Sequence, residues 1–191
     1  VCSAGIEDFV TVGEMSSTSL EHCIRYSSPK EKELSMCFNF HHLKVDYKDG
    51  DKWTLAVPDY KKLKELFMQW QLGMQAGVGW NALFWCNHDQ PHIVSRMGDE
   101  GDYWKESAKM LAGMIHLMRG TPYIYQGEEI GMLNAHYSSI GQYRDVESLN
   151  YYQILLGKGR TEEEALRILA ARSRDNGRTP MQWNSGTYGG F

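Results

Sequence analysis

The feature that most constrains this chain is a regular alternation of short apolar runs with longer amphipathic stretches. Runs rich in β-branched and aromatic residues occupy residues 8–14, 33–40, 80–87 and 121–126. Between them, apolar side chains recur at helical spacing in residues 20–26, 58–75 and 106–119. Strands separated by helices in this order pair in parallel, because each helix returns the chain to the same end of the sheet. The pattern therefore predicts an α/β fold with a parallel sheet covered by helices.

The C-terminal part of the sequence is less regular. Helical patterns are predicted at residues 146–156 and 161–171, whereas residues 135–145 have the composition of a loop. With 191 residues, of which 42% are hydrophobic, the chain can bury one sizeable core. It ends at residues 189–191 outside any predicted helix or strand, which suggests a piece of a longer protein.

Charge and composition argue against several partners. The formal net charge is −4 and lysines and arginines do not cluster, so we expect no nucleic-acid partner. No run approaches the ~20 apolar residues of a membrane span, and a basic-then-apolar leader pattern is absent, so we expect no membrane partner. The widely spaced cysteines predict free thiols and a reducing, cytoplasmic location. They are Cys2, Cys23, Cys37 and Cys86.

Carboxylates follow three of the predicted strands. Glu14 ends the first strand, and Asp89 follows the third with His88 before it. Glu128 and Glu129 follow the fourth strand. Because the carboxyl ends of parallel strands meet at one edge of a sheet, we expect these acids to lie near one another. Two carboxylates on either side of a sugar, one protonated and one ionised, are what glycosidic bond cleavage requires.

Each of these acids also has a structural interpretation. Glu14 can cap the helix that follows it, because a helix N-terminus favours an anion. Residues 128–129 can belong to a tight turn, because a glycine flanks them on each side. The pair His88 and Asp89 can be a buried polar contact or two zinc ligands. No third ligand lies at a suitable spacing, so we expect no metal site.

Four segments together resemble the α-amylase superfamily in its oligo-1,6-glucosidase branch. They are residues 11–15 (TVGEM), 83–91 (LFWCNHDQP), 120–132 (GTPYIYQGEEIGM) and 173–183 (SRDNGRTPMQW). The family fold is a (β/α)₈ barrel with its active site at the C-terminal ends of the strands. The resemblance implies that residues 1–191 form a partial catalytic barrel domain, the C-terminal half with strands five to eight, as a fragment of a longer enzyme. A half barrel has open sheet edges, so we expect the fragment to self-associate.

The resemblance also assigns roles residue by residue. It makes Glu14 the general acid and base, and Asp89 the carboxylate that holds the reacting sugar and stabilises an oxocarbenium-like transition state. His88 is expected to hydrogen-bond the same ring, Arg174 to contact the nonreducing glucose and Arg178 to assist it. The nucleophilic aspartate of the family lies on the fourth strand, outside these residues. We therefore expect the 191 residues alone to be inactive, and the resemblance implies no cofactor.

Residues 38–47 (FNFHHLKVDY) bear on which sugar is cleaved. They place His41, His42 and Lys44 at the end of the second predicted strand, and an ammonium group with one or two imidazole donors suits a phosphate. These residues and residues 14–19 (EMSSTS) resemble the trehalose-6-phosphate hydrolases of this branch. The resemblance thus implies a retaining α-glucosidase whose intact form converts α,α-trehalose 6-phosphate to glucose and glucose 6-phosphate. A solvent-exposed basic loop is the alternative interpretation.

Other functions stay open at this point. An oligo-1,6-glucosidase or a transglycosylating relative is the nearest alternative enzyme. A noncatalytic heavy chain of amino-acid transporters is similar in sequence to these enzymes, but the joint presence of the predicted site residues argues against it, and equally against a sugar-binding module without chemistry. One position departs from the family: His92 stands where an arginine usually follows Asp-Gln-Pro, which puts a charge contact there in doubt.

Overall fold

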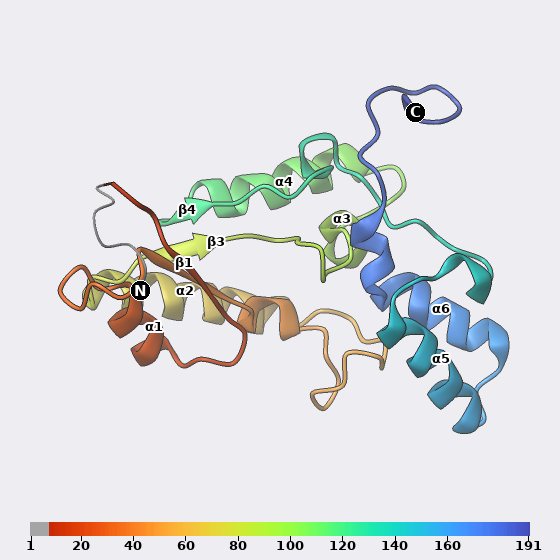
Figure 1. Ribbon diagram of the computed structural model, residues 1–191, viewed down its shortest axis with the longest axis horizontal. Coiled ribbons are helices and arrows are strands. Elements are labelled where there is room, and N and C mark those ends of the chain that lie inside the picture. Colours follow the sequence, from red (N-terminus) through yellow and green to blue (C-terminus); the bar gives the residue numbers. More distant parts are fainter. Residues whose placement is uncertain (1–7) are drawn as a thin grey trace. The chain divides into compact units, whose positions relative to one another are not determined.

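The structure is a computed structural model that describes residues 8–191 (Figure 1). The chain divides into two compact units. The sheet unit contains the described residues up to Val45 together with 59–83 and 117–123. The helical unit contains residues 46–58, 84–116 and 124–191.

The sheet unit is built on four strands in chain order, β1 to β4. They are β1 (Val12–Met15), β2 (Met36–Asn39), β3 (Asn81–Leu83) and β4 (Thr121–Pro122). All three pairings are parallel, with Glu14 opposite Phe38 in the first pair and Ala82 opposite Thr121 in the last. This order confirms the parallel sheet predicted from the alternation of strand and helix patterns.

Among the residues that the structure describes, two α-helices belong to the sheet unit. α1 (Leu20–Ser27) is capped by Ser19 and α2 (Tyr60–Ala76) by Asp59, and each of these side chains accepts a hydrogen bond from a first-turn amide. The two helices contact one another, and α1 also contacts β2. Their shared core contains Cys23, Cys37, Trp70 and Met74.

The helical unit contains four α-helices within its described residues. They are α3 (Ile93–Met97), α4 (Trp104–His116), α5 (Val146–Gly157) and α6 (Glu162–Arg172). Thr161 and Glu164 form a reciprocal capping box that starts α6. α5 and α6 contact each other, and the loop containing Trp53 completes their core. The fully or nearly buried members are Trp53, Tyr143, Tyr152, Leu155, Ala165, Ile168 and Leu169.

The third strand is shorter than predicted. The apolar run indicates a strand over residues 80–87, but β3 ends at Leu83. Its partner β4 ends at Pro122, and the Tyr123 amide just beyond it donates to the Leu83 carbonyl oxygen at 2.7 Å. Residues 84–86 stay buried without being in a strand. A continuous apolar run reports burial and does not by itself distinguish a strand from other buried backbone.

The helix predicted at residues 106–119 ends earlier, at His116. Gly120 was expected to end this helix, but the helix ends before it, and Gly120 instead lies directly before β4. Its φ is +153°, and a Cβ atom there would lie 2.7 Å from the carbonyl oxygen of Asn81. The glycine therefore lets the start of β4 approach β3 closely. The short helix α3 is not predicted at all, because five residues carry too little periodicity.

Three cysteines are buried with free thiols, as predicted: Cys23, Cys37 and Cys86. The prediction for Cys2 lies outside the described residues. Among residues 8–191, none of the helices combines the length and the apolar character needed to cross a membrane.

Candidate functional site

Asp89 lies in a turn formed by residues 87–90, which follow β3 in the sequence. The Asn87 side-chain oxygen accepts a hydrogen bond from the Asp89 amide at 2.8 Å. The Asn87 carbonyl oxygen accepts another from the Gln90 amide at 3.1 Å. Asparagine favours such turns because its side chain bonds to backbone two residues further on. The turn leaves the Asp89 side chain 30% exposed, so a ligand can reach the carboxylate.

Two arginines hold the Asp89 carboxylate. Both come from η4 (Arg174–Arg178), a 3₁₀ turn that directly follows α6. Arg178 Nη2 donates to Asp89 Oδ1 at 2.8 Å, and Arg174 Nη1 lies 3.5 Å from the same oxygen. His88 Nε2 lies 3.7 Å from this oxygen, and the imidazole is mostly exposed. The helical unit thus brings together four of the residues predicted from sequence.

Arg178 also contacts a second acid. Its Nη1 donates to Asp145 Oδ2 at 2.6 Å, and its Nε donates to the His88 carbonyl oxygen at 2.8 Å. Asp145 is in turn the N-cap of α5. Burial acts to lower the pKa of Arg178, but its contacts with Asp89 and Asp145 raise it above the ordinary value. Arg178 therefore stays charged and connects the Asp89 turn with the start of α5.

The Asp89 turn and η4 approach each other through backbone. A Cβ atom on Gly177 would lie 2.6 Å from the Gln90 carbonyl oxygen and 2.9 Å from that of Asn87. The Tyr125 hydroxyl donates to the Gly177 carbonyl oxygen at 2.7 Å and supports η4 from another side. Only glycine fits this approach. Gly177 was not predicted from the sequence, although a glycine between two candidate site arginines is a signal that could have identified it.

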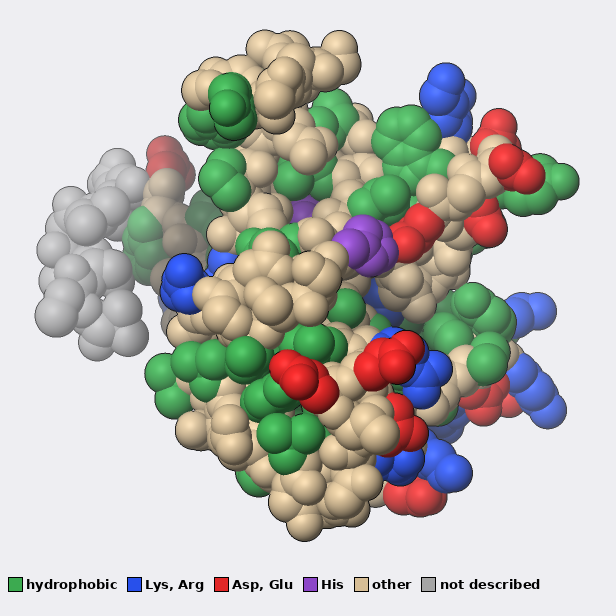
Figure 2. All heavy atoms as spheres, turned by 90° about the vertical axis from the view of Figure 1, so that its right-hand side faces the viewer, with side chains coloured by type: hydrophobic (Ala, Val, Ile, Leu, Met, Phe, Trp, Pro, Cys, Tyr) green, Lys and Arg blue, Asp and Glu red, His purple; other side chains and the backbone are tan. Residues whose placement is uncertain are grey.

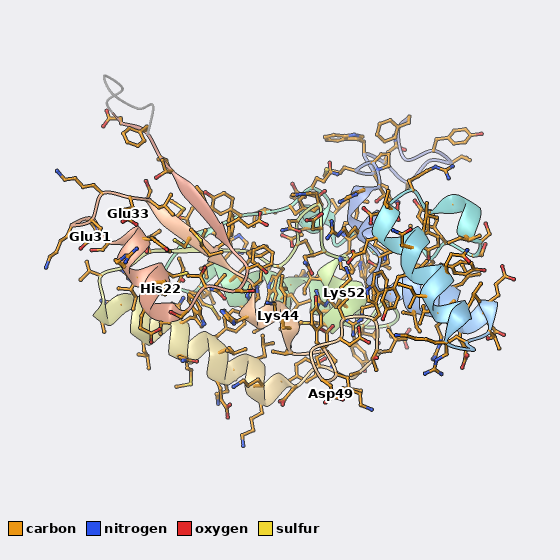
Figure 3. All side chains as sticks on the ribbon, turned by 60° about the horizontal axis from the view of Figure 1, so that its bottom comes forward. His22, Glu31, Glu33, Lys44, Asp49 and Lys52 are labelled. Carbon is orange, nitrogen blue, oxygen red and sulfur yellow. The ribbon has the colours of Figure 1, made fainter. Side chains whose placement is uncertain are left out.

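Arg174 has a second acidic partner, Glu147 of α5. Arg174 Nε lies 3.0 Å from Glu147 Oε2, and Lys52 Nζ donates to the same oxygen at 2.6 Å. Figure 3 labels Lys52. Burial lowers the pKa of Lys52, and the Glu147 carboxylate opposes this effect. Nothing in the sequence pattern relates Lys52 or Glu147 to Asp89, so both were missed.

Charges of both signs therefore alternate around Asp89. Lys52, Glu147, Arg174, Asp89, Arg178 and Asp145 form one continuous series of ion pairs. Figure 2 shows acidic and basic side chains lying next to one another on one face. Such an arrangement orients each group by its neighbours and offers hydrogen-bond donors and acceptors suited to the hydroxyls of a sugar.

Glu14 belongs to the sheet unit, whereas Asp89 belongs to the helical unit. Glu14 lies in β1 with an exposed side chain. Its interpretation as the cap of α1 is wrong, because Ser19 occupies that position and accepts the hydrogen bond from the His22 amide. Glu14 is thus a solvent-facing carboxylate whose position is set by the pairing of β1 with β2.

The three predicted phosphate-binding side chains lie on η1 (His41–Lys44), a 3₁₀ turn that follows β2. Lys44 Nζ donates to the Ser16 carbonyl oxygen at 3.0 Å. His41 Nε2 lies 3.0 Å from the Thr18 carbonyl oxygen. Both residues therefore contact the loop that directly follows Glu14 and β1. Lys44 is labelled in Figure 3.

The two histidines of η1 differ in exposure. His41 is half-buried and stacks on Trp70, with ring centroids 5.3 Å apart. His42 is only 6% exposed and packs beside Phe67. The donors that η1 presents to solvent are therefore His41 and Lys44, whereas His42 faces the core.

Glu128 and Glu129 form a tight turn between two left-handed glycines, Gly127 and Gly131. The carboxylate of Glu128 accepts a hydrogen bond from the Tyr125 amide at 3.2 Å, and that of Glu129 from the Gly127 amide at 2.8 Å. Burial raises the pKa of Glu128. These local contacts support the structural interpretation of the pair. No group of three or more His, Cys, Asp or Glu within residues 8–191 is placed to hold a metal ion.

Comparisons with known proteins support the predicted resemblance. The family model "Alpha amylase, catalytic domain" matches residues 1–191. The chain is 65% identical over 182 residues to trehalose-6-phosphate hydrolase of Escherichia coli, covering 95% of this chain and 33% of that protein. It is 48% identical over 184 residues to an oligo-1,6-glucosidase of Halalkalibacterium halodurans, covering 96% and 33%.

A solved structure is similar as well. The crystal structure of trehalose-6-phosphate hydrolase from Bacillus licheniformis matches with a TM-score of 0.92 and 61% identity. The match covers 95% of this chain and 33% of that one. The chain thus spans about a third of the length of the relatives it matches.

Proposed function

This chain belongs to the α-amylase catalytic-domain family, and on this premise we propose that it forms part of a retaining α-glucosidase acting on trehalose 6-phosphate. The family fold is a (β/α)₈ barrel. In the proposed enzyme, residues 1–191 are a partial catalytic barrel domain, and β1 to β4 are barrel strands five to eight. Support comes from the parallel chain-order sheet and from the third of the relatives' length that the chain spans. Outside the intact enzyme, the edge strands β1 and β4 favour self-association.

Glu14 is proposed as the general acid and base. In the first step it protonates the leaving glycosidic oxygen, and in the second it takes a proton from the attacking water. Its exposed position on β1 supports this role, because both the leaving group and the water must reach it. The nucleophilic carboxylate of the proposed reaction comes from a part of the enzyme outside these residues. Each of the two steps inverts the anomeric carbon, so the overall reaction retains its configuration.

Asp89 is proposed to hold the hydroxyls of the reacting glucose. Its carboxylate also faces the positive charge that develops on the sugar ring in the transition state. Arg174 and Arg178 keep it in one orientation, and His88 lies beside it to bond the same ring. Because these donors are in place before substrate arrives, little reorganisation is needed during the reaction.

The phosphate of the substrate is proposed to bind at η1. Lys44 supplies the positive charge, His41 supplies an imidazole donor, and His42 supports the turn from the core. The ammonium group of Lys44 is bound to a backbone carbonyl oxygen and pairs with no acid among residues 8–191, so its charge is available to an anion.

One observation carries the choice of substrate. Over almost the same share of this chain, identity is 65% to a trehalose-6-phosphate hydrolase and 48% to an oligo-1,6-glucosidase. The test compares the full-length enzyme on trehalose 6-phosphate and on isomaltose at equal enzyme concentration. We expect kcat/KM to favour trehalose 6-phosphate by at least about 100-fold, as expected when a site built to bind a polar group meets an analogue that lacks it. Preference for isomaltose would establish the oligo-1,6-glucosidase alternative, and no hydrolysis of either would support a noncatalytic role.

A further inference from the structure

A buried carboxylate lies behind the Asp89 site, on a loop distant from it in sequence. Asp46 begins the part of the helical unit formed by residues 46–58, and it is 2% exposed. The loop reverses at Asp49 and Gly50, both with positive φ, and Lys48 bridges to Asp51. Figure 3 labels Asp49 on this loop. The mechanism proposed above uses no residue of the loop.

Two arginines converge on Asp46. Arg96 of α3 binds both carboxylate oxygens, with Nε to Oδ2 and Nη2 to Oδ1 each at 2.8 Å. Arg172, the last residue of α6, contacts Oδ2 through Nη1 and the Asp46 carbonyl oxygen through Nη2 at 3.0 Å. Both guanidinium groups are themselves buried, with side-chain exposures of 3% and 6%. Bidentate contacts of this kind fix both direction and distance.

The carboxylate of Asp46 is charged in this environment. Burial alone raises its pKa, but the hydrogen bonds and charges of Arg96 and Arg172 outweigh burial and hold the pKa below its usual range. Removal of the carboxylate would leave two buried guanidinium groups without their shared anion. Such unpaired buried charges force local rearrangement.

Each arginine is connected to one of the two turns that form the Asp89 site, Arg96 by a hydrogen bond and Arg172 along the chain. Arg96 Nη1 lies 2.8 Å from Gln90 Oε1, and Gln90 is the neighbour of Asp89 in its turn. Arg172 stands two residues before Arg174, at the point where α6 gives way to η4. Asp46 is therefore a carboxylate shared by both arginines that lead to these turns.

We propose that Asp46 is a positioning residue that sets the distance between Asp89 and Arg174. The inference deepens the proposed function, on which it rests, by assigning Asp46 to the glucose-binding side of the site. It does not contact the sugar. It acts by holding the Asp89 turn and η4 in register, and a displacement of about 1 Å between them is enough to cost about 100-fold in rate.

The test uses the full-length enzyme and the neutral substrate p-nitrophenyl α-glucoside, which needs the glucose side of the site but no phosphate contact. For Asp46→Asn we expect kcat/KM to fall by about 100-fold. Inhibition by 1-deoxynojirimycin, a glucose-shaped amine, is expected to weaken in parallel, because it depends on Asp89. Inhibition by glucose 6-phosphate is expected to change less than about twofold, because its phosphate binds at η1. A general loss of structure would weaken both inhibitors equally.

A second variant keeps the test decisive if Asp46→Asn does not fold. Gln90→Met removes only the acceptor of Arg96 Nη1 and leaves the Asp46 cluster intact, so we expect a fall of about 10-fold in kcat/KM with the same inhibitor pattern. Leu155→Ala is the matched control, because it opens a cavity in the α5 and α6 core without touching a site turn. It should lower the melting temperature but leave kcat/KM per folded enzyme within about twofold.

The outcomes separate the inference from the function on which it rests. Activity within about threefold of wild type for both Asp46→Asn and Gln90→Met would overturn the positioning role. Equal weakening of both inhibitors would also overturn it, because that result indicates a structural role alone. If the wild-type enzyme instead prefers isomaltose, the proposed substrate fails, while the comparison of variants on the neutral glucoside still decides the role of Asp46.

Discussion

The sheet unit and the helical unit hold their candidate site residues by different physical means. In the sheet unit, Glu14 is placed by backbone pairing of β1 with β2, and Lys44 by a hydrogen bond to a backbone carbonyl oxygen. In the helical unit, Asp89 is placed by the side chains of Arg174 and Arg178. Backbone pairing does not depend on which side chain a strand carries, whereas an ion-pair series changes when any member is replaced. A substitution should therefore act locally in the first unit and spread in the second.

The largest effects are expected at Glu14 and Asp89. In the full-length enzyme, Glu14→Gln and Asp89→Asn should each lower kcat by about 1,000-fold or more, because each removes a group proposed to act in the transition state. Their melting temperatures should differ. Glu14→Gln should leave it unchanged, whereas Asp89→Asn should lower it, because both arginines lose a partner. Equal melting temperatures for the two variants would contradict the contrast between the units, and a mild loss in kcat for Glu14→Gln would remove its acid and base role.

The next largest effect is expected at Gly177. A Cβ atom at this position would meet two carbonyl oxygens of the Asp89 turn, so Gly177→Ala should push η4 and this turn apart. We expect kcat/KM for trehalose 6-phosphate to fall by about 100-fold. The fall should come mainly from kcat, with little change in KM. Gly113→Ala is the control, because that glycine lies in α4 and a Cβ atom there would meet no atom beyond its own helix backbone within 4 Å. Steady-state kinetics of the two variants decides whether backbone contact shapes the site, and equal activities would show that it does not.

A smaller and more selective effect is expected at Lys44. Lys44→Ala should raise KM for trehalose 6-phosphate by about 10-fold, the loss of roughly one charge-assisted contact, and should leave KM for p-nitrophenyl α-glucoside unchanged. Lys48→Ala is the matched control, since Lys48 is an exposed lysine from a neighbouring loop. Equal effects on both substrates would show that η1 is a basic surface turn and not a phosphate site.

The smallest effect concerns stability and pH. His92 is 2% exposed, its Nε2 has no hydrogen-bond partner among residues 8–191, and burial lowers its pKa. The unfolded chain protonates this imidazole near pH ~6.5, whereas the folded chain does so only at lower pH. Unfolding therefore takes up a proton in this window, and His92 makes the protein less stable as pH falls below about 6.5.

Thermal unfolding measures this contribution directly. Between about pH 7.5 and about pH 5, the melting temperature of His92→Gln should fall less than that of wild type, because the glutamine takes up no proton. His22→Gln provides the control, since His22 is an exposed residue of α1 (Figure 3). An identical pH dependence for wild type and His92→Gln would show that burial of His92 is not coupled to protonation. Because burial lowers its pKa, the His92 imidazole is neutral at about pH 7 and makes no charge contact at this position.

Much of the fold was predictable because its signals are local. The parallel sheet and the helices α1, α2, α5 and α6 were each indicated by the spacing of apolar residues. The residues at which strands end were harder to predict from the sequence. The end of β3 depends on its pairing with β4, which lies far along the chain, and a local pattern contains no information about the partner.

Some residues of the candidate site were likewise predictable from the sequence, and others were found only in the structure. The sequence by itself determined which chemical groups follow its strand and helix patterns: Glu14 after a β-branched run, His88 and Asp89 after an aromatic run, and the arginines of η4 after a helical pattern. Tertiary structure alone decided which of them meet. It added Lys52 and Glu147 from segments with no motif, and Asp46 from a segment that the sequence related only to a phosphate. The physical reason is range. Propensity and periodicity act over a few residues, whereas a bond from Arg172 to Asp46 joins positions 126 residues apart and forms only when the chain is folded.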